Sequence, residues 1–192
     1  MRVARAVALV AGVRVGSAAA STERVASIAR SIAEALRLDP ATADRCEATG
    51  WLRDIGLVAL PDDVLSPAHP DAAADSPVRR MHVVLGEQAV RRVPEIAALG
   101  PAIRHHHERF DGSGYPDALA GGDVPVEARV VACAEAVATL VPEVAEGRVR
   151  RQGVVRLRER AGAALDPGTV EAAVVALAAE AGRAGQYLPR AA

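Results

Sequence analysis

The sequence has 192 residues, of which 51% are apolar and 24% are charged, and its formal net charge is −1. This length suits one domain with a buried core, and the balanced charge gives no sign of a nucleic-acid or membrane partner. All 23 basic side chains are Arg, which excludes a lysine Schiff base and a lysine phosphate clamp. Only 2% of the residues are aromatic, so the core must be built from Ala, Val, Leu and Ile, which favours closely packed helices.

The periodicity of the apolar residues predicts helices through nearly the whole chain. In chain order, we expect helices over residues 25–38, capped by Ser21 or Thr22, then over 41–51, 78–93, 95–107, 126–140 and 170–181. Loops are expected at 66–76 and at the Gly-rich stretch 111–123. No segment alternates as a strand would. The predicted fold class is therefore all-α, with a single domain over residues 1–192, about seven to nine helices and a frayed tail over 183–192.

The cysteines and the N-terminus bear on the location of the protein. Cys46 and Cys133 lie in separate apolar stretches, so we expect buried, reduced thiols, which favour the cytoplasm. The first twenty residues are similar in composition to a signal peptide, but Arg14 interrupts the apolar run. No apolar run approaches the roughly 18 residues of a membrane span. We therefore expect a cytoplasmic protein without an export signal.

A group of histidines is the most informative feature of the sequence. His105, His106 and His107 are consecutive at the end of an expected helix, and a Gly-rich loop follows them. Adjacent helical residues point roughly 100° apart, so no more than two of the three can face one site. His82 lies four residues before Gly86, where the missing side chain leaves room for a neighbouring group. This is a candidate metal or phosphate site, and the alternative is a polar helix end at the surface.

The segment HHERFDGSGYP, residues 106–116, resembles the signature of HD-GYP domains, which are metal-dependent phosphodiesterases of cyclic dinucleotides. Further elements follow the order of that family. They are STERV at 21–25, RDIGLVALPDDVL at 53–65, His82-x-x-x-Gly86, ARVVACAEAVATL at 128–140 and AGAALDPGTV at 161–170. The resemblance covers about residues 14–182 and implies an HD-type helical bundle.

The resemblance also implies a metal cluster. In HD-GYP domains, His and carboxylate ligands hold two or three metal ions, usually iron or manganese, which polarise the phosphodiester and supply a hydroxide. Carried over to this sequence, the metal ligands are Asp54, His82, His106, His107 and Glu135, and Asp54 is the catalytic candidate. The candidates for substrate binding are Arg53, Gly112, Gly114, Tyr115 and Pro116. The implied partner is a cyclic dinucleotide such as cyclic di-GMP, or a signalling protein.

Three positions depart from the HD-GYP pattern. Ser21 and Arg53 stand where the family has His, and Leu57 stands where it has Lys. Arg cannot be deprotonated in proteins, so Arg53 cannot replace an imidazole ligand. We predict instead that Arg53 forms a salt bridge with Asp54 or Glu135 and takes over the charge-balancing role of a lost metal ion. Such a site would still bind phosphate through the fork of guanidinium donors.

Two functions from different classes follow from these residues. The first is a cyclic di-GMP phosphodiesterase that works with an incomplete metal cluster. The second is a degenerate module that binds a nucleotide or a signalling partner without hydrolysing it. The three replacements favour the second function, whereas the retained histidines and the GYP loop favour the first.

Several polar residues near these motifs have simpler interpretations. We expect His105 and His69 to face solvent, and residues 148–151 to form a solvated face instead of a nucleic-acid site. Glu108 and Asp111 are expected to act as caps or to pair with Arg109. Gly112, Gly114, Tyr115 and Pro116 are expected to form a turn that positions the helix end.

Overall fold

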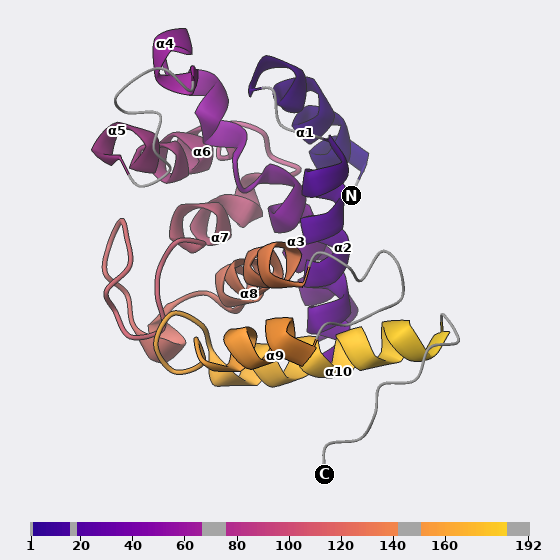
Figure 1. Cartoon of the computed structure of the whole chain (residues 1–192). Coiled ribbons are helices and arrows are strands. Elements are labelled where there is room, and N and C mark those ends of the chain that lie inside the picture. Colours follow the sequence, from indigo (N-terminus) through magenta and orange to yellow (C-terminus); the bar gives the residue numbers. More distant parts are fainter. Residues whose placement is uncertain (1, 16–18, 67–75, 142–150, 184–192) are drawn as a thin grey trace.

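The computed structural model describes residues 2–15, 19–66, 76–141 and 151–183, and within these ranges the protein is built of helices (Figure 1). The α-helices are α1 (Arg2–Val15), α2 (Ala19–Ala35), α3 (Pro40–Leu52), α4 (Asp62–Leu65), α5 (Pro77–Arg80), α6 (His82–Val90), α7 (Gly100–His105), α8 (Val126–Leu140), α9 (Arg151–Arg158) and α10 (Pro167–Arg183). Short 3₁₀ helices occupy Ile55–Ala59, Ala97–Leu99 and Gly121–Asp123. The only β-type pairing in the described ranges is an isolated bridge between Ala161 and Leu165. The predicted all-α class is confirmed.

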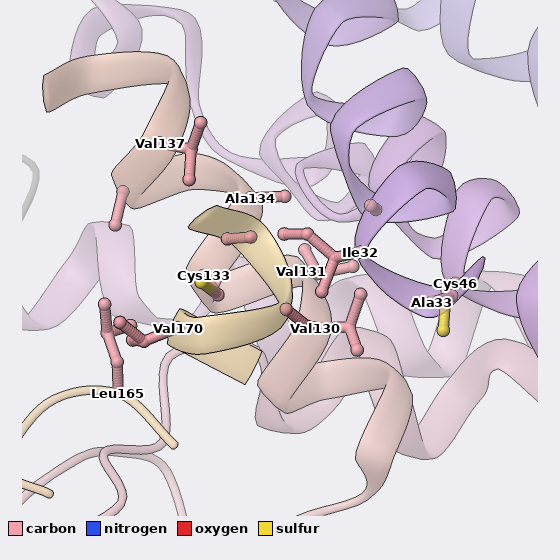
Figure 2. Packing of buried hydrophobic residues seen from close by; sticks show 14 of the residues in the cluster. Ile32, Ala33, Cys46, Val130, Val131, Cys133, Ala134, Val137, Leu165 and Val170 are labelled. Carbon is pink, nitrogen blue, oxygen red and sulfur yellow. The ribbon is translucent and has the colours of Figure 1, made fainter. Parts of the chain in front are cut away.

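The main core lies where α2, α3, α8 and α10 pack together (Figure 2). Its buried members are aliphatic or small, and they include Ile32, Ala33, Cys46, Val130, Val131, Cys133, Ala134, Val137, Leu165 and Val170. Small residues let the helices approach closely: a Cβ atom on Gly50 would lie 2.7 Å from the Ala26 Cα atom of α2. The core is thus built without aromatic residues, as the composition predicts.

Helix α1 packs on α3 and closes a second, smaller core that contains Trp51, Leu52 and Ile103. The outer face of α1 exposes Val10 and Val13. None of the described helices is both long enough and apolar enough to cross a bilayer. Both cysteines are free and buried, as expected, and burial raises the pKa of each thiol to about 12.

The predicted helix boundaries need three corrections. A cap at Ser21 or Thr22 is wrong, because α2 already includes Ala19, and alanine favours helix over cap. The expected helix over 78–93 is two helices that meet at Met81, because the Met81 N–H bonds to the Val78 carbonyl in the tighter 3₁₀ pattern and the His82 side chain takes the Arg79 carbonyl. The expected helix over 95–107 shrinks to α7, with a 3₁₀ turn before it. The frayed tail beyond residue 183 and most of the loop 66–76 lie outside the described residues.

Candidate metal centre

Three histidines from two helices meet at one point of the structure. His82 is the first residue of α6, whereas His106 and His107 directly follow α7. Each offers one ring nitrogen, and these nitrogens lie within 4.8 Å of one another. The ring centroids are 5.5 Å apart for His82 and His106, 5.1 Å for His82 and His107, and 4.1 Å for His106 and His107. The structure therefore brings together the three histidines that the sequence predicted to share a site.

The backbone orients two of these rings. The Nδ1 atom of His82 bonds to the carbonyl oxygen of Arg79 at 2.6 Å, and that of His106 bonds to the carbonyl of Ile103 at 2.7 Å. Because a carbonyl only accepts, each Nδ1 must carry the proton, which leaves Nε2 as a lone-pair atom in the neutral ring. Both Nε2 atoms are buried and have no hydrogen-bond partner. Histidines that bind a metal ion typically have this arrangement, in which one ring nitrogen faces the metal and the other donates a hydrogen bond to a backbone carbonyl.

The electrostatics keep both buried histidines neutral. Burial lowers the pKa of His106 well below its ordinary value, and the neighbouring His107, His82 and Arg53 lower it further. Burial also lowers the pKa of His82, although its bond to the Arg79 carbonyl and the nearby Asp54 act in the opposite direction. Neutral imidazole is the form that binds a metal ion. The donor set therefore fits a divalent cation such as iron or manganese.

Two glycines bring the next candidate, Asp54, to this cluster. A Cβ atom on Gly56 would lie 1.9 Å from the carbonyl oxygen of His82 and 2.5 Å from the Gly86 nitrogen. Only glycines allow the 3₁₀ turn after Asp54 to rest directly on the first turn of α6. As a result, the Oδ1 atom of Asp54 lies 3.9 Å from His82 Nε2. The room predicted at Gly86 is indeed filled by a neighbouring group, the backbone of Gly56.

Arg53 lies between the two carboxylates of the site. Its Nε atom donates to Glu135 Oε1 at 2.5 Å, and its terminal nitrogen lies 3.2 Å from Asp54 Oδ2. A third contact, at 2.8 Å, goes to the carbonyl of Gly50. Burial raises the pKa of Glu135 to about 7, although the charge of Arg53 acts against this rise. The predicted salt bridge is confirmed, and it involves both carboxylates instead of one.

The loop with the GYP motif covers one side of the histidines. The Tyr115 ring stacks on the ring of His107 at 5.0 Å, and the guanidinium of Arg80 lies 4.8 Å from the centre of the same tyrosine ring. A Cβ atom on Gly114 would lie 2.2 Å from the Arg109 nitrogen, and Gly112 has a φ of +81°. The loop thus has the expected structural role. Contacts of Gly112, Gly114, Tyr115 and Pro116 with a substrate stay predictions.

Sequence reasoning missed a second cluster beside this loop. Asp117 accepts hydrogen bonds from Arg104, at 2.6 and 2.8 Å, and lies 2.9 Å from His105 Nε2. Glu108 accepts from the Asp117 backbone N–H at 2.7 Å. The expectation that His105 faces solvent is therefore wrong, since its side chain is only 14% exposed. Asp111 does pair with Arg109, at 2.9 Å. No local pattern links His105 to a residue twelve positions later.

The other positions at which the sequence departs from the HD-GYP pattern are less central in the structure. Ser21 is exposed on α2, whereas its neighbour Thr22 lines a small cavity of about 20 Å³ together with Asp54. Leu57 is half-buried in the 3₁₀ turn after Asp54. His69 and residues 148–150 lie outside the described residues.

A helical bundle in which three histidines converge places this protein among all-α folds with a candidate metal centre. Residues 8–168 match the family described as HD domain, so the chain belongs to the HD-domain family. It is 37% identical over 126 residues to the "Cyclic di-GMP phosphodiesterase response regulator RpfG" of Xanthomonas campestris, which covers 64% of this chain and 33% of that protein. The expected resemblance to HD-GYP phosphodiesterases is confirmed.

Two further relatives differ in the substrate that their names give. The chain is 33% identical over 120 residues to "3'3'-cGAMP-specific phosphodiesterase 2" of Vibrio cholerae, covering 60% of this chain and 23% of that protein. It is 30% identical over 122 residues to a "Cyclic di-GMP phosphodiesterase" of Thermotoga maritima, covering 62% and 33%. The matched region thus spans no more than about a third of the length of these relatives.

Proposed function

We propose that this chain is a cytoplasmic HD-GYP-type phosphohydrolase domain that hydrolyses a phosphodiester bond of a cyclic dinucleotide, such as cyclic di-GMP, with a divalent cation. The observation that carries the proposal is the pair of buried Nε2 atoms, on His82 and His106, which have no hydrogen-bond partner. Leaving buried polar atoms unsatisfied costs free energy, and a metal ion bound by these two nitrogens would remove that cost. The names of the relatives supply the class of substrate.

The candidate ligands are His82, His106, His107 and Asp54, with Glu135 as a further candidate. A divalent cation held there would polarise the phosphodiester and activate a water molecule. The backbone bonds of His82 and His106 hold their ring planes, so these two rings need little reorganisation on binding. Asp54 presents Oδ1 on the histidine side and can take a proton from the attacking water.

The loop with the GYP motif forms one side of the proposed site. The Tyr115 ring is fixed against His107, and it limits how water and substrate reach that histidine. We propose that a base or sugar of the dinucleotide packs along the part of the loop that contains Gly112, Gly114 and Pro116, next to the Tyr115 ring.

A second candidate function is a module that binds the dinucleotide or a signalling protein without hydrolysis. The specific observation in its favour is the position of Arg53, whose charge engages both carboxylates of the site. A guanidinium there competes with any cation for Asp54 and Glu135.

The two functions are separated by incubating the purified protein with cyclic di-GMP, or with 3'3'-cGAMP, in the presence of Mn²⁺ or Fe²⁺. Linear dinucleotide or mononucleotide that disappears in His106→Ala would establish the phosphodiesterase. Saturable binding without product, in a sample that has taken up metal, would establish the binding module. Neither product nor binding would contradict both.

A further inference from the structure

We infer that Arg53 is a built-in cation that replaces one metal ion of the cluster, so that the site takes up a single divalent cation on its histidine side. The inference rests on the proposed function, and it adds the number of metal ions that the site of this chain can hold. It differs from the expectation carried over from HD-GYP domains, in which two or three ions share the ligands.

The first step is the position of the guanidinium. The Arg53 side chain is only 8% exposed, and its nitrogens contact Glu135, Asp54 and the Gly50 carbonyl. A metal ion that used both carboxylates would have to displace a charge that cannot be neutralised, because Arg keeps its proton at any relevant pH. Arg53 therefore holds the place between the carboxylates by charge and by geometry.

The second step is the division of the site into two halves. Asp54 directs Oδ2 to Arg53 and Oδ1 to the histidine side, where it lies 3.9 Å from His82 Nε2. The half that contains His82, His106 and His107 has ring nitrogens within 4.8 Å of one another, and two of them have no partner. One half is thus satisfied by an arginine, whereas two ring nitrogens of the other half have no hydrogen-bond partner.

The third step is the charge balance. Asp54 and Glu135 bring two negative charges when ionised, and Arg53 offsets one of them, while the three histidines are neutral ligands. One divalent cation reverses the remaining negative charge to a single positive charge. A second cation would add two further positive charges beside the guanidinium, in a partly buried site where such repulsion is poorly screened. The electrostatics therefore favour one ion.

A matched control lies on the same two helices. Arg45 of α3 donates to Glu127 of α8 at 2.7 Å, eight residues before Arg53 and Glu135 respectively. The Arg45 side chain is 40% exposed, compared with 8% for Arg53, and it bonds to Glu127 and Thr42, neither of which is a candidate ligand. A substitution of Arg45 thus removes an Arg–Glu bridge between the same helices without touching the site.

The test measures metal content directly and does not depend on turnover. The purified protein is stripped with a chelator and titrated with Mn²⁺. Bound manganese is then counted by elemental analysis, and its electron paramagnetic resonance spectrum is recorded. We expect one ion per chain with the hyperfine pattern of an isolated Mn²⁺. In Arg53→His, which adds an imidazole and removes the charge, we expect two ions per chain with a spin-coupled spectrum, whereas Arg45→His keeps one.

A second variant protects the test against misfolding of Arg53→His. Arg53→Gln removes the charge without adding a strong ligand, and it should tighten the first Mn²⁺ by about tenfold or more, because the nearby positive charge is gone. Two ions in the wild-type protein, a single ion in folded Arg53→His, or an unchanged affinity in Arg53→Gln would each overturn the inference. Two bound ions together with hydrolysis would contradict the inference but support the proposed function. One bound ion without hydrolysis would support the inference but contradict the proposed hydrolysis. No bound ion would overturn both.

Discussion

Two clusters at the end of α7 contain similar residues but have different roles. The inner cluster consists of His82, His106 and His107, and the outer cluster consists of His105, Glu108 and Asp117; in each, the potential ligand atoms lie within 4.8 Å of one another. In the outer cluster, Arg104 already donates two hydrogen bonds to Asp117. A cation there would have to compete with this bidentate pair. Proximity of ligand atoms alone therefore does not define a metal site.

The inner cluster differs because the Nε2 atoms of His82 and His106 bond to no carboxylate, whereas His105 Nε2 bonds to the Asp117 carboxylate that Arg104 also holds. The backbone occupies Nδ1 of His82 and His106, and their buried Nε2 atoms have no hydrogen-bond partner. The guanidinium of Arg53 is engaged by Asp54 and Glu135 instead. The groups around a histidine thus determine whether a ring nitrogen is available to a cation or is held by a hydrogen bond to a loop residue.

The largest effect that would sharpen this comparison is expected from His106→Ala. Removing a direct ligand should weaken Mn²⁺ binding by more than about 100-fold, since loss of an outer-shell partner alone can cost up to that much. Isothermal titration of the folded variant with Mn²⁺ measures the change. His105→Ala is the control from the adjacent residue, and it should bind Mn²⁺ as the wild-type protein does. Equal losses in the two variants would mean that the clusters do not differ in the way described.

The sequence predicts the inner cluster much better than the outer one. The HH pair and the His82-x-x-x-Gly86 spacing mark positions whose neighbours are defined by helices, and the opposite charges of Arg53 and Glu135 were enough to predict their pairing. Asp117 lies in a loop without periodicity, and it reaches His105 only because the chain turns back at Gly112 and Gly114. Helical geometry shows that His105 points away from His106, but it does not show which group lies there.

The helix boundaries show the same difference between features that periodicity predicts and features that depend on a single contact. The all-α class and the buried faces come from periodicity, which is a property of many residues together. The break at Met81 coincides instead with one side-chain bond, in which the Nδ1 atom of His82 bonds to the carbonyl oxygen of Arg79 at 2.6 Å. A single local bond of this kind competes with a periodic pattern that continues across it, so the pattern predicts one helix where there are two.

The next largest effect is expected from Gly114→Ala, which would disturb both clusters at once. The new Cβ atom would lie 2.2 Å from the Arg109 nitrogen and 2.5 Å from the Glu108 Cα atom, both of which are backbone atoms that cannot yield locally. Overpacking of this kind should lower the free energy of unfolding by about 2–3 kcal/mol. Chemical denaturation measures the loss.

The control for this loop variant is Gly122→Ala. Nothing lies within 4 Å of a Cβ atom at Gly122, so its stability should change by less than about 0.5 kcal/mol. Equal stability of Gly114→Ala and Gly122→Ala would contradict the prediction. It would mean that the two clusters do not depend on the close approach of the loop to Arg109.

The smallest effect is expected from Asp117→Asn, which removes the Asp117 charge from the outer cluster and leaves the inner one intact. Arg104 and His105 hold the pKa of the Asp117 carboxyl well below its ordinary value of 3.8, so the folded state binds its proton less readily than the unfolded state. The stability from this charge is therefore present above about pH 4 and is lost as the pH falls below it. Because the carboxylate is more than a third exposed, solvent screening limits the contribution to about 0.5–1 kcal/mol.

Urea unfolding at pH 7 should show this loss in the variant, and the difference from the wild-type protein should shrink near pH 3, with Mn²⁺ affinity at pH 7 unchanged. A loss of Mn²⁺ affinity in Asp117→Asn would instead join the two clusters into one site.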